Sequence, residues 1–146
     1  MEKAINIQNR KARHEYFFLE EYEAGAVLLG SEVKSIKDGK VSLVDAYCYF
    51  DKGELWLKSM TVTPVDQNYT HEPQRLRKLL LHRHQLHSLE KNLVSGTTIV
   101  VTQIKSVKGR IKFCIALARG KKNYDKREDS KKREAQKEIR YESNAR

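Results

Sequence analysis

Strict alternation of apolar and polar side chains near residue 110 constrains the fold more than any other feature of the chain. In the segment 110–117, RIKFCIAL, every second position is apolar, namely Ile111, Phe113, Ile115 and Leu117. A period of two is typical of a β-strand that buries one face. We therefore expect these four residues to face a core and Arg110, Lys112 and Cys114 to lie on the opposite face.

Turn signals predict antiparallel partners for this strand and for others. Lys108-Gly109 indicates a tight turn back to a β-branched strand over 97–105, and Asp51-Lys52-Gly53 joins strands over 41–50 and 54–62. We expect a third hairpin between 14–20 and 26–29, with its turn around 23–25.

Two segments have helical patterns. A short helix over 32–37 is expected, with Ser31 as its cap and Asp38-Gly39 at its end. A longer helical region lies between residues 73 and 95, where Pro73 suits the first turn. Its apolar residues recur at helical spacing, at Leu76, Leu79, Leu80, Leu86, Leu89 and Leu93. The pattern leaves open whether this region is one helix or two.

These elements predict a mainly β fold with inserted helices. About six short antiparallel strands favour a small closed OB-like barrel, the usual small barrel that binds oligonucleotides, although alternation alone fits a sandwich equally well. A length of 146 residues suits one domain. We expect an N-terminal arm over 1–12, the OB-like RNA-binding barrel over 13–119 and a basic tail over 120–146.

The tail is set apart by its charge. Residues 119–146 hold 11 Lys and Arg against 6 Asp and Glu. Their net charge of +5 is half of the formal net charge of +10 of the chain. Beyond Gly120 the apolar side chains are few and cannot offset the cost of ordering the backbone, ~1–2 kcal/mol per residue. Lys, Arg, Glu and Gln are nevertheless good helix formers. We expect a tail that is disordered when free and becomes helical against an anionic partner; a purely solubilising tail is the alternative.

Several classes of protein are disfavoured. No apolar run approaches the ~18 residues of a membrane span, and the start lacks a secretory apolar stretch, so we expect a cytoplasmic protein. Cys48 and Cys114 are too far apart for a CxxC motif, and neither has a neighbouring base. His82, His84 and His87 lack an acidic or thiol partner for a metal. We predict no catalytic residue, no metal, no cofactor and no small-molecule substrate.

Basic residues, by contrast, recur in groups that suit a phosphate backbone. A-form RNA displays phosphates and 2′-hydroxyls, so a protein reads it mostly by shape. Asn9 and Glu23 could add polar contacts among the cations. The residues predicted from the chain itself to contact RNA are Asn9, Arg10, Lys11, Glu23, Arg75, Arg77, Lys78, Arg110 and Lys112.

Five stretches, in this order, resemble the small protein B family, the SsrA-binding proteins of bacterial trans-translation. The resemblance covers roughly residues 7–140. The stretches are Asn9-Arg10-Lys11-Ala12, Glu23-Ala24-Gly25, Glu32-Val33-Lys34-Ser35, Pro73 with Arg75 and Arg77-Lys78-Leu79-Leu80-Leu81, and Gly120-Lys121-Lys122 followed by Asp125-Lys126-Arg127.

The resemblance implies a non-enzymatic OB-like protein that binds the tRNA-like domain of transfer-messenger RNA (SsrA) and brings it to stalled ribosomes. It implies contacts to that domain from Asn9, Glu23, Leu80 and Lys112. It also implies that the tail becomes helical in the vacant messenger channel of the small subunit. Tyr124 stands where many members have His, and its ring can stack on a base. The residues expected to serve the tail's role on the ribosome are Gly120, Lys121, Lys122, Tyr124, Asp125, Lys126, Arg127, Lys131, Lys132 and Arg133.

Three other readings of the residues remain open. A general RNA-binding or ribosome-associated OB protein would have the same basic groups. The carboxylates at 20, 21 and 23 could serve a metal-dependent nuclease. A structural adaptor for acidic proteins would also carry excess positive charge.

Overall fold

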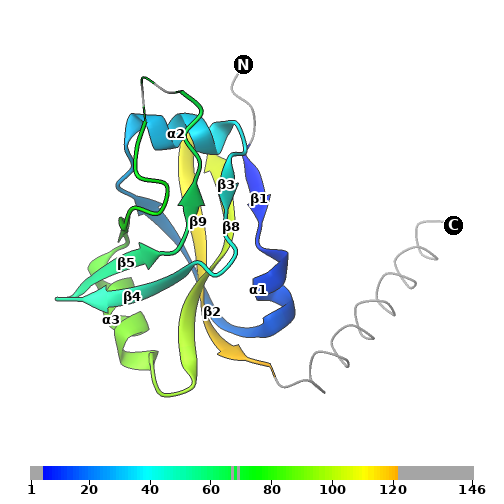
Figure 1. The fold of residues 1–146 in the computed structure, drawn as a ribbon. Coiled ribbons are helices and arrows are strands. Elements are labelled where there is room, and N and C mark those ends of the chain that lie inside the picture. Colours follow the sequence, from blue (N-terminus) through cyan, green and yellow to red (C-terminus); the bar gives the residue numbers. More distant parts are fainter. Residues whose placement is uncertain (1–4, 67, 69, 122–146) are drawn as a thin grey trace, which may run out of the picture.

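The computed structural model describes residues 5–66, 68 and 70–121 (Figure 1). Its elements, in chain order, are β1 (Asn6–Gln8), α1 (Arg10–Glu15), β2 (Tyr16–Ala26), α2 (Gly30–Lys37), β3 (Val41–Ser42), β4 (Tyr47–Asp51), β5 (Glu54–Lys58), β6 (Thr61–Val62), β7 (Arg77–Leu80), α3 (Arg83–Asn92), β8 (Thr97–Val107) and β9 (Arg110–Gly120).

Six of these strands close into a ring. They pair in the order β8-β4-β5-β7-β2-β9, and β9 pairs again with β8. Every one of these pairs is antiparallel. β1 pairs with residues 103–105 of β8, while β4 pairs with residues 99 and 100. The expected mainly β fold with inserted helices, closed by about six antiparallel strands, is confirmed, and closure of the ring excludes the sandwich.

The main core fills this ring. From β9, Phe113, Ile115 and Leu117 are buried in it and Ile111 packs against it, so the alternation assigned the inner face of this strand correctly. Each large apolar side chain buried in this way contributes ~1.5–3 kcal/mol. A smaller cluster on the other side of β8 and β9 joins Ala12 of α1 to Val100, Ala116 and Ala118.

The predicted turns at 51–53 and 108–109 are confirmed. β4 and β5 pair from Tyr47↔Lys58 to Asp51↔Glu54, and β3 and β6 continue the same hairpin through Val41↔Val62. Lys108 and Gly109 both have positive φ, at 51° and 78°. This is the geometry of a two-residue turn that matches the twist of the flanking strands.

The hairpin expected between 14–20 and 26–29 is wrong, because β2 is one continuous strand. Glu23 and Ala24 pair with Cys114 and Phe113 of β9, and Gly25 pairs with Leu80 of β7. Residues 23–25 are therefore extended in the sheet rather than turned. Acidic residues and glycine are typical of turns, but here the backbone of this segment pairs with two neighbouring strands, β9 and β7.

The helical region expected over 73–95 is also only half right. Arg77–Leu80 form β7, and a single helix, α3, follows from Arg83. Pro73 consequently lies in a loop rather than in a first helical turn. β7 pairs with both β5 and β2, and this tertiary pairing overrides the helix propensity of its leucines.

Helix α2 lies across the upper end of the ring in Figure 1. It begins one residue before Ser31, so Ser31 is not its cap. The Ser31 hydroxyl instead lies 2.9 Å from Nδ1 of His71, whose Nε2 donates to the Val62 carbonyl at 2.7 Å. None of the three described helices has the length and apolar character that crossing a membrane requires.

Candidate nucleic-acid interface

Three of the predicted contact residues lie on adjoining strands of one outer surface. Glu23 lies on β2, Lys112 on β9 and Leu80 on β7, opposite Gly25 of β2. Leu80 is 49% exposed although it is apolar, while its neighbour Leu79 is buried in the core. We call this surface, defined by Glu23, Leu80, Lys105 and Lys112, the β9–β2–β7 face.

Lys105 joins this face from β8 and is not among the residues predicted from the sequence. It pairs in register with Lys112, and its Nζ lies 3.1 Å from Oε2 of Glu23. The hydrogen bond to Glu23 raises the pKa of Lys105. The two-residue turn at 108–109 was the available signal, because it fixes the register that places Lys105 opposite Lys112.

Asn9 is buried and acts inside the molecule. Its side-chain oxygen accepts from the Ala12 N–H at 3.1 Å, which caps α1. Its amide nitrogen donates to the carbonyls of Val101 at 2.8 Å and Leu43 at 3.3 Å. One side chain thus holds the start of α1 against β8 and the loop before β4.

The neighbours of Asn9 reach solvent. Arg10 is exposed on α1, and Lys11 forms an ion pair with Asp45 at 3.2 Å. The hydrogen bond to Asp45 raises the pKa of Lys11. These cations border the loop before β4 and do not join the β9–β2–β7 face through any contact that the described residues make.

The cations at 75 and 77 are drawn inward by Glu32 of α2. Arg77 is fully buried, and its Nε lies 2.6 Å from Oε2 of Glu32. The Arg77 guanidinium also donates to the carbonyls of Met60 at 2.6 Å and Pro73 at 3.1 Å. Arg75 binds the other carboxylate oxygen of Glu32 and donates to the Val27 carbonyl at 3.2 Å. The expectation that Arg77 belongs to an exposed basic group is therefore wrong.

Burial and ion pairing have opposing effects on the pKa values in this buried group. Burial by itself raises the pKa of Glu32, but hydrogen bonds from Arg75, the Leu29 N–H and Arg77 outweigh it, so the pKa lies below its usual range. Burial lowers the pKa of Arg77, and Glu32 offsets this only in part. Glu32 is therefore held as a carboxylate, and α2 is fixed to β7.

The two remaining predicted cations of the folded part are at the surface. Lys78 points outward from β7 and lies 3.2 Å from Oε1 of Glu54. Arg110 is exposed at the start of β9, beside the turn at 108–109. Arg110 therefore extends the positive charge of the β9–β2–β7 face toward that turn.

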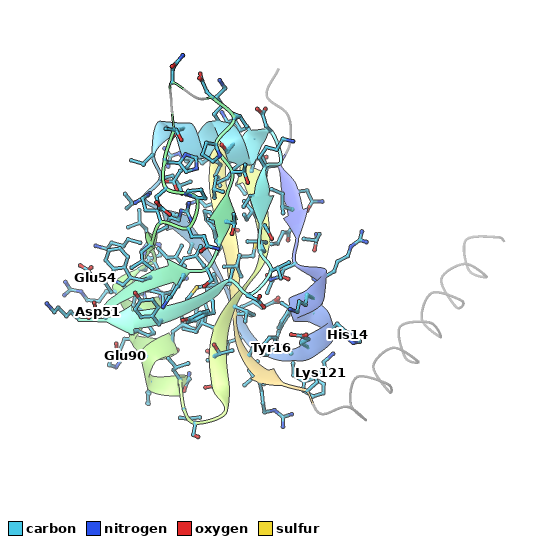
Figure 2. All side chains as sticks on the ribbon, in the orientation of Figure 1. His14, Tyr16, Asp51, Glu54, Glu90 and Lys121 are labelled. Carbon is cyan, nitrogen blue, oxygen red and sulfur yellow. The ribbon has the colours of Figure 1, made fainter. Side chains whose placement is uncertain are left out.

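The start of the tail is fixed to α1 and β2. The Lys121 N–H donates to the Glu15 carbonyl at 2.8 Å, and its Nζ donates to the Arg13 carbonyl at 3.2 Å. Arg119 and Lys121 both lie over the ring of Phe17, at 5.1 Å and 5.0 Å from its centroid. Figure 2 shows Lys121 beside His14 and Tyr16, below α1. We call Glu15, Phe17, Arg119 and Lys121 the tail root.

Gly120 and Lys121 are thus the predicted tail residues that the structure places. The others lie outside the described residues, and so does the expectation of a tail that is disordered when free. They are Lys122, Tyr124, Asp125, Lys126, Arg127, Lys131, Lys132 and Arg133.

The cysteines and histidines considered for catalysis or metal binding lie in surroundings that favour neither role. Burial raises the pKa of both thiols, that of Cys48 in β4 and that of Cys114 in β9, so neither is activated as a nucleophile. His82 and His84 stack on each other with ring centroids 5.6 Å apart. Within residues 5–66, 68 and 70–121, no three His, Cys, Asp or Glu side chains gather in a way that could hold a metal ion.

Comparison with known proteins gives one consistent result. The family model described as "SmpB protein" matches residues 6–145. The "SsrA-binding protein" of Desulforudis audaxviator is 50% identical over 135 residues, which are 90% of this chain and 88% of the relative. That of Geobacillus thermodenitrificans is 46% identical over 141 residues, covering 94% of this chain and 91% of the relative. A solved structure described as "tmRNA-SmpB: a journey to the center of the bacterial ribosome" has a TM-score of 0.69 and 39% identity, and the match covers 85% of this chain and 93% of that one.

Proposed function

The chain belongs to the SmpB protein family, and from this premise we propose that it binds the tRNA-like domain of transfer-messenger RNA and delivers it to stalled ribosomes. The relatives are named SsrA-binding protein, and the description of the similar structure names tmRNA-SmpB and the bacterial ribosome. The observation that carries the proposal is the gathering of Glu23, Leu80 and Lys112 from three strands on one surface.

The β9–β2–β7 face has the chemistry that folded RNA requires. Lys112, Lys105 and Arg110 provide cations for phosphates, and a protein that reads RNA by shape depends on such contacts. Glu23 can accept hydrogen bonds from 2′-hydroxyls or base amino groups, and Lys105 holds its carboxylate in place. Leu80 offers an exposed apolar contact to a base or a sugar.

Two residues of the proposed RNA-binding set act from inside the molecule. Asn9 positions α1 through three hydrogen bonds, and Arg77 fixes β7 to α2, so that Lys78 and Leu80 point outward. We propose that both are positioning residues and that Arg10, Lys11, Arg75 and Lys78 add peripheral positive charge.

We propose that the tail serves the ribosome rather than the transfer-messenger RNA. In this proposal residues 122–146 become helical in the empty messenger channel, where Tyr124, Asp125, Lys126 and Arg127 contact small-subunit RNA in place of a codon–anticodon pair. The composition of the tail and the fixed position of the tail root support this division. The protein would then act in the cytoplasm, without a cofactor and without catalysing a reaction.

A chain that ends at Lys121 tests the division of labour. This end point keeps the hydrogen bonds of Lys121 to Arg13 and Glu15. We expect the shortened protein to bind the tRNA-like domain within about twofold of the full chain and to fail in tagging stalled peptides in a translation assay. Full tagging by the shortened protein would refute the role of the tail.

Substitution of Lys112 tests the RNA surface. We expect Lys112→Ala to weaken binding of the tRNA-like domain roughly 5-fold and to lower the slope of log K against log salt by about 1. The matched control is Lys37→Ala, which removes an exposed lysine from the last turn of α2. Equal affinities for the two variants at fixed salt would exclude the β9–β2–β7 face.

A further inference from the structure

The outer side of the β4–β5 hairpin carries three aromatic side chains that the core does not use. Cys48, Leu55 and Leu57 point into the ring, and by alternation Tyr47, Tyr49 and Trp56 point outward. Tyr47 is 37% exposed, and none of the three aromatic residues belongs to either core cluster. Tyr49 and Trp56 are partly exposed beside Tyr47, and aromatic rings grouped on one outer face can contact a partner.

Strand register gathers the three rings with two lysines. Tyr49 pairs directly with Trp56, Tyr47 pairs with Lys58, and Trp56 pairs on its other side with Lys78 of β7. The rings of Tyr47 and Tyr49 are 6.4 Å apart between centroids and tilted by 45°. We call Tyr47, Tyr49, Trp56, Lys58 and Lys78 the aromatic platform.

We propose that the aromatic platform binds unpaired nucleotides of the same RNA that the β9–β2–β7 face holds. The inference rests on the proposed function for the identity of that RNA. The two surfaces adjoin at β7, where Lys78 and Leu80 both point outward, one toward each surface. An RNA chain leaving the β9–β2–β7 face therefore meets the aromatic platform next.

The chemistry of the aromatic platform fits single-stranded RNA. Bases stack on aromatic side chains whatever their sequence, and each stacked base typically contributes roughly 5- to 160-fold in affinity. Lys58 and Lys78 lie beside the rings, where the phosphates of stacked nucleotides would pass. The ion pair of Lys78 with Glu54 is exposed, and exposed pairs are weak enough for a phosphate to replace the carboxylate.

Acidic side chains limit the part of this surface on which RNA would lie. Asp51 and Glu54 lie at the tip of the β4–β5 hairpin, which projects from the body of the molecule in Figure 2. The tip beyond Lys78 is therefore unfavourable for phosphate. At the opposite end Tyr47 lines a cavity of about 300 Å³ together with Lys11 and Tyr16, but also with the acidic Glu15 and Asp45. The three rings, with Lys58 and Lys78 beside them, are therefore the part of this surface that suits RNA, between acidic side chains at both ends.

Trp56 is the single tryptophan of the chain, so tryptophan fluorescence reports on binding at the aromatic platform. The full-length protein is titrated with the tRNA-like domain of transfer-messenger RNA and, separately, with an unstructured RNA oligonucleotide. We expect both RNAs to quench the Trp56 fluorescence. Binding of the tRNA-like domain without quenching would overturn the aromatic platform but leave the proposed function intact. Quenching by the oligonucleotide alone would overturn the assignment to that RNA.

Substitution of Tyr49 provides a second, independent test. We expect Tyr49→Leu to weaken binding of the tRNA-like domain roughly tenfold, whereas Tyr49→Phe keeps the ring and should bind within twofold of the wild type. Both variants alter an outward side chain, so thermal unfolding should show the same fold. Equal affinity of Tyr49→Leu and the wild type would overturn the proposal. Lys112→Ala should weaken binding yet leave the quenching at saturation unchanged.

Discussion

Strands β7 and β9 both begin with an arginine, but they place it in opposite environments. Each of the two stretches has two basic residues among apolar ones, in Arg77-Lys78-Leu79-Leu80 and in Arg110-Ile111-Lys112-Phe113. Arg77 is fully buried, whereas Arg110 is exposed and Lys112 points to the outer side. The difference is Glu32, which α2 places against β7. A cation in a basic protein is therefore not evidence of an RNA contact until its partners are known.

Replacing both cations by the same apolar residue should separate the two roles most strongly. Arg77→Met leaves the Glu32 carboxylate buried with one cation fewer, and removing one member of a buried ion pair typically costs ~3–5 kcal/mol. Lys112→Met should change the free energy of unfolding by less than ~0.5 kcal/mol. Urea denaturation of both full-length variants measures the difference, and two equally stable variants would break the comparison.

The pH dependence of stability should depend on the carboxylate that Arg77 faces. Because the folded-state pKa of Glu32 is lowered, its contribution is fully present above the unfolded-state pKa of ~4.3 and is lost as the pH falls through the folded-state pKa. We expect the free energy of unfolding of the wild type to be about 2 kcal/mol higher than that of Glu32→Gln at pH 7, because hydrogen bonds to charged groups contribute about this much. Urea denaturation between pH 7 and pH 3 should show this difference in stability becoming smaller below pH ~4. A difference that is constant over this range would contradict the buried carboxylate.

The smallest expected effect concerns cations that are neither buried nor placed on the β9–β2–β7 face. Phe17→Leu removes the ring under Arg119 and Lys121, and an exposed cation–π contact is worth ~0.5–1 kcal/mol. We expect amide hydrogen exchange at Lys121 to become roughly 5-fold faster, with RNA affinity unchanged. Leu19→Ala, an exposed truncation in the same strand, is the control. Equal protection of Lys121 in the two variants would show that Phe17 does not hold the tail root.

The parts of the fold that could be predicted are those in which local pattern and tertiary pairing agree. Alternation in β9 and the turns at 51–53 and 108–109 predicted the hairpins and the inner face of β9. The patterns at 23–25 and 73–80 misled because strands distant in the chain determine their conformation. Gly25 suits a turn, and the leucines of β7 suit a helix. The chain elsewhere supplies edges that pair with both segments.

The candidate interface could be predicted by residue type but not by location. Lys112, Glu23 and Leu80 share a surface only because β2 pairs with β9 and β7, and no periodicity along the chain contains that information. Amides and guanidiniums suit RNA, so the sequence predicts RNA contacts for Asn9 and Arg77. Capping of α1 and the carboxylate of Glu32 require the same donors and acceptors, and these partners lie close at hand in the fold.

Ring closure through β9 also governs when the protein can finish folding. β2 ends at Ala26, and the strand that covers most of one of its edges begins 84 residues later, at Arg110. At a synthesis rate of ~5–20 residues per second, that edge waits roughly 4–17 s for its partner. Unpaired edges invite aggregation, and charged side chains discourage it. Glu20, Glu21 and Glu23 give the nascent strand such protection until its partner has been made.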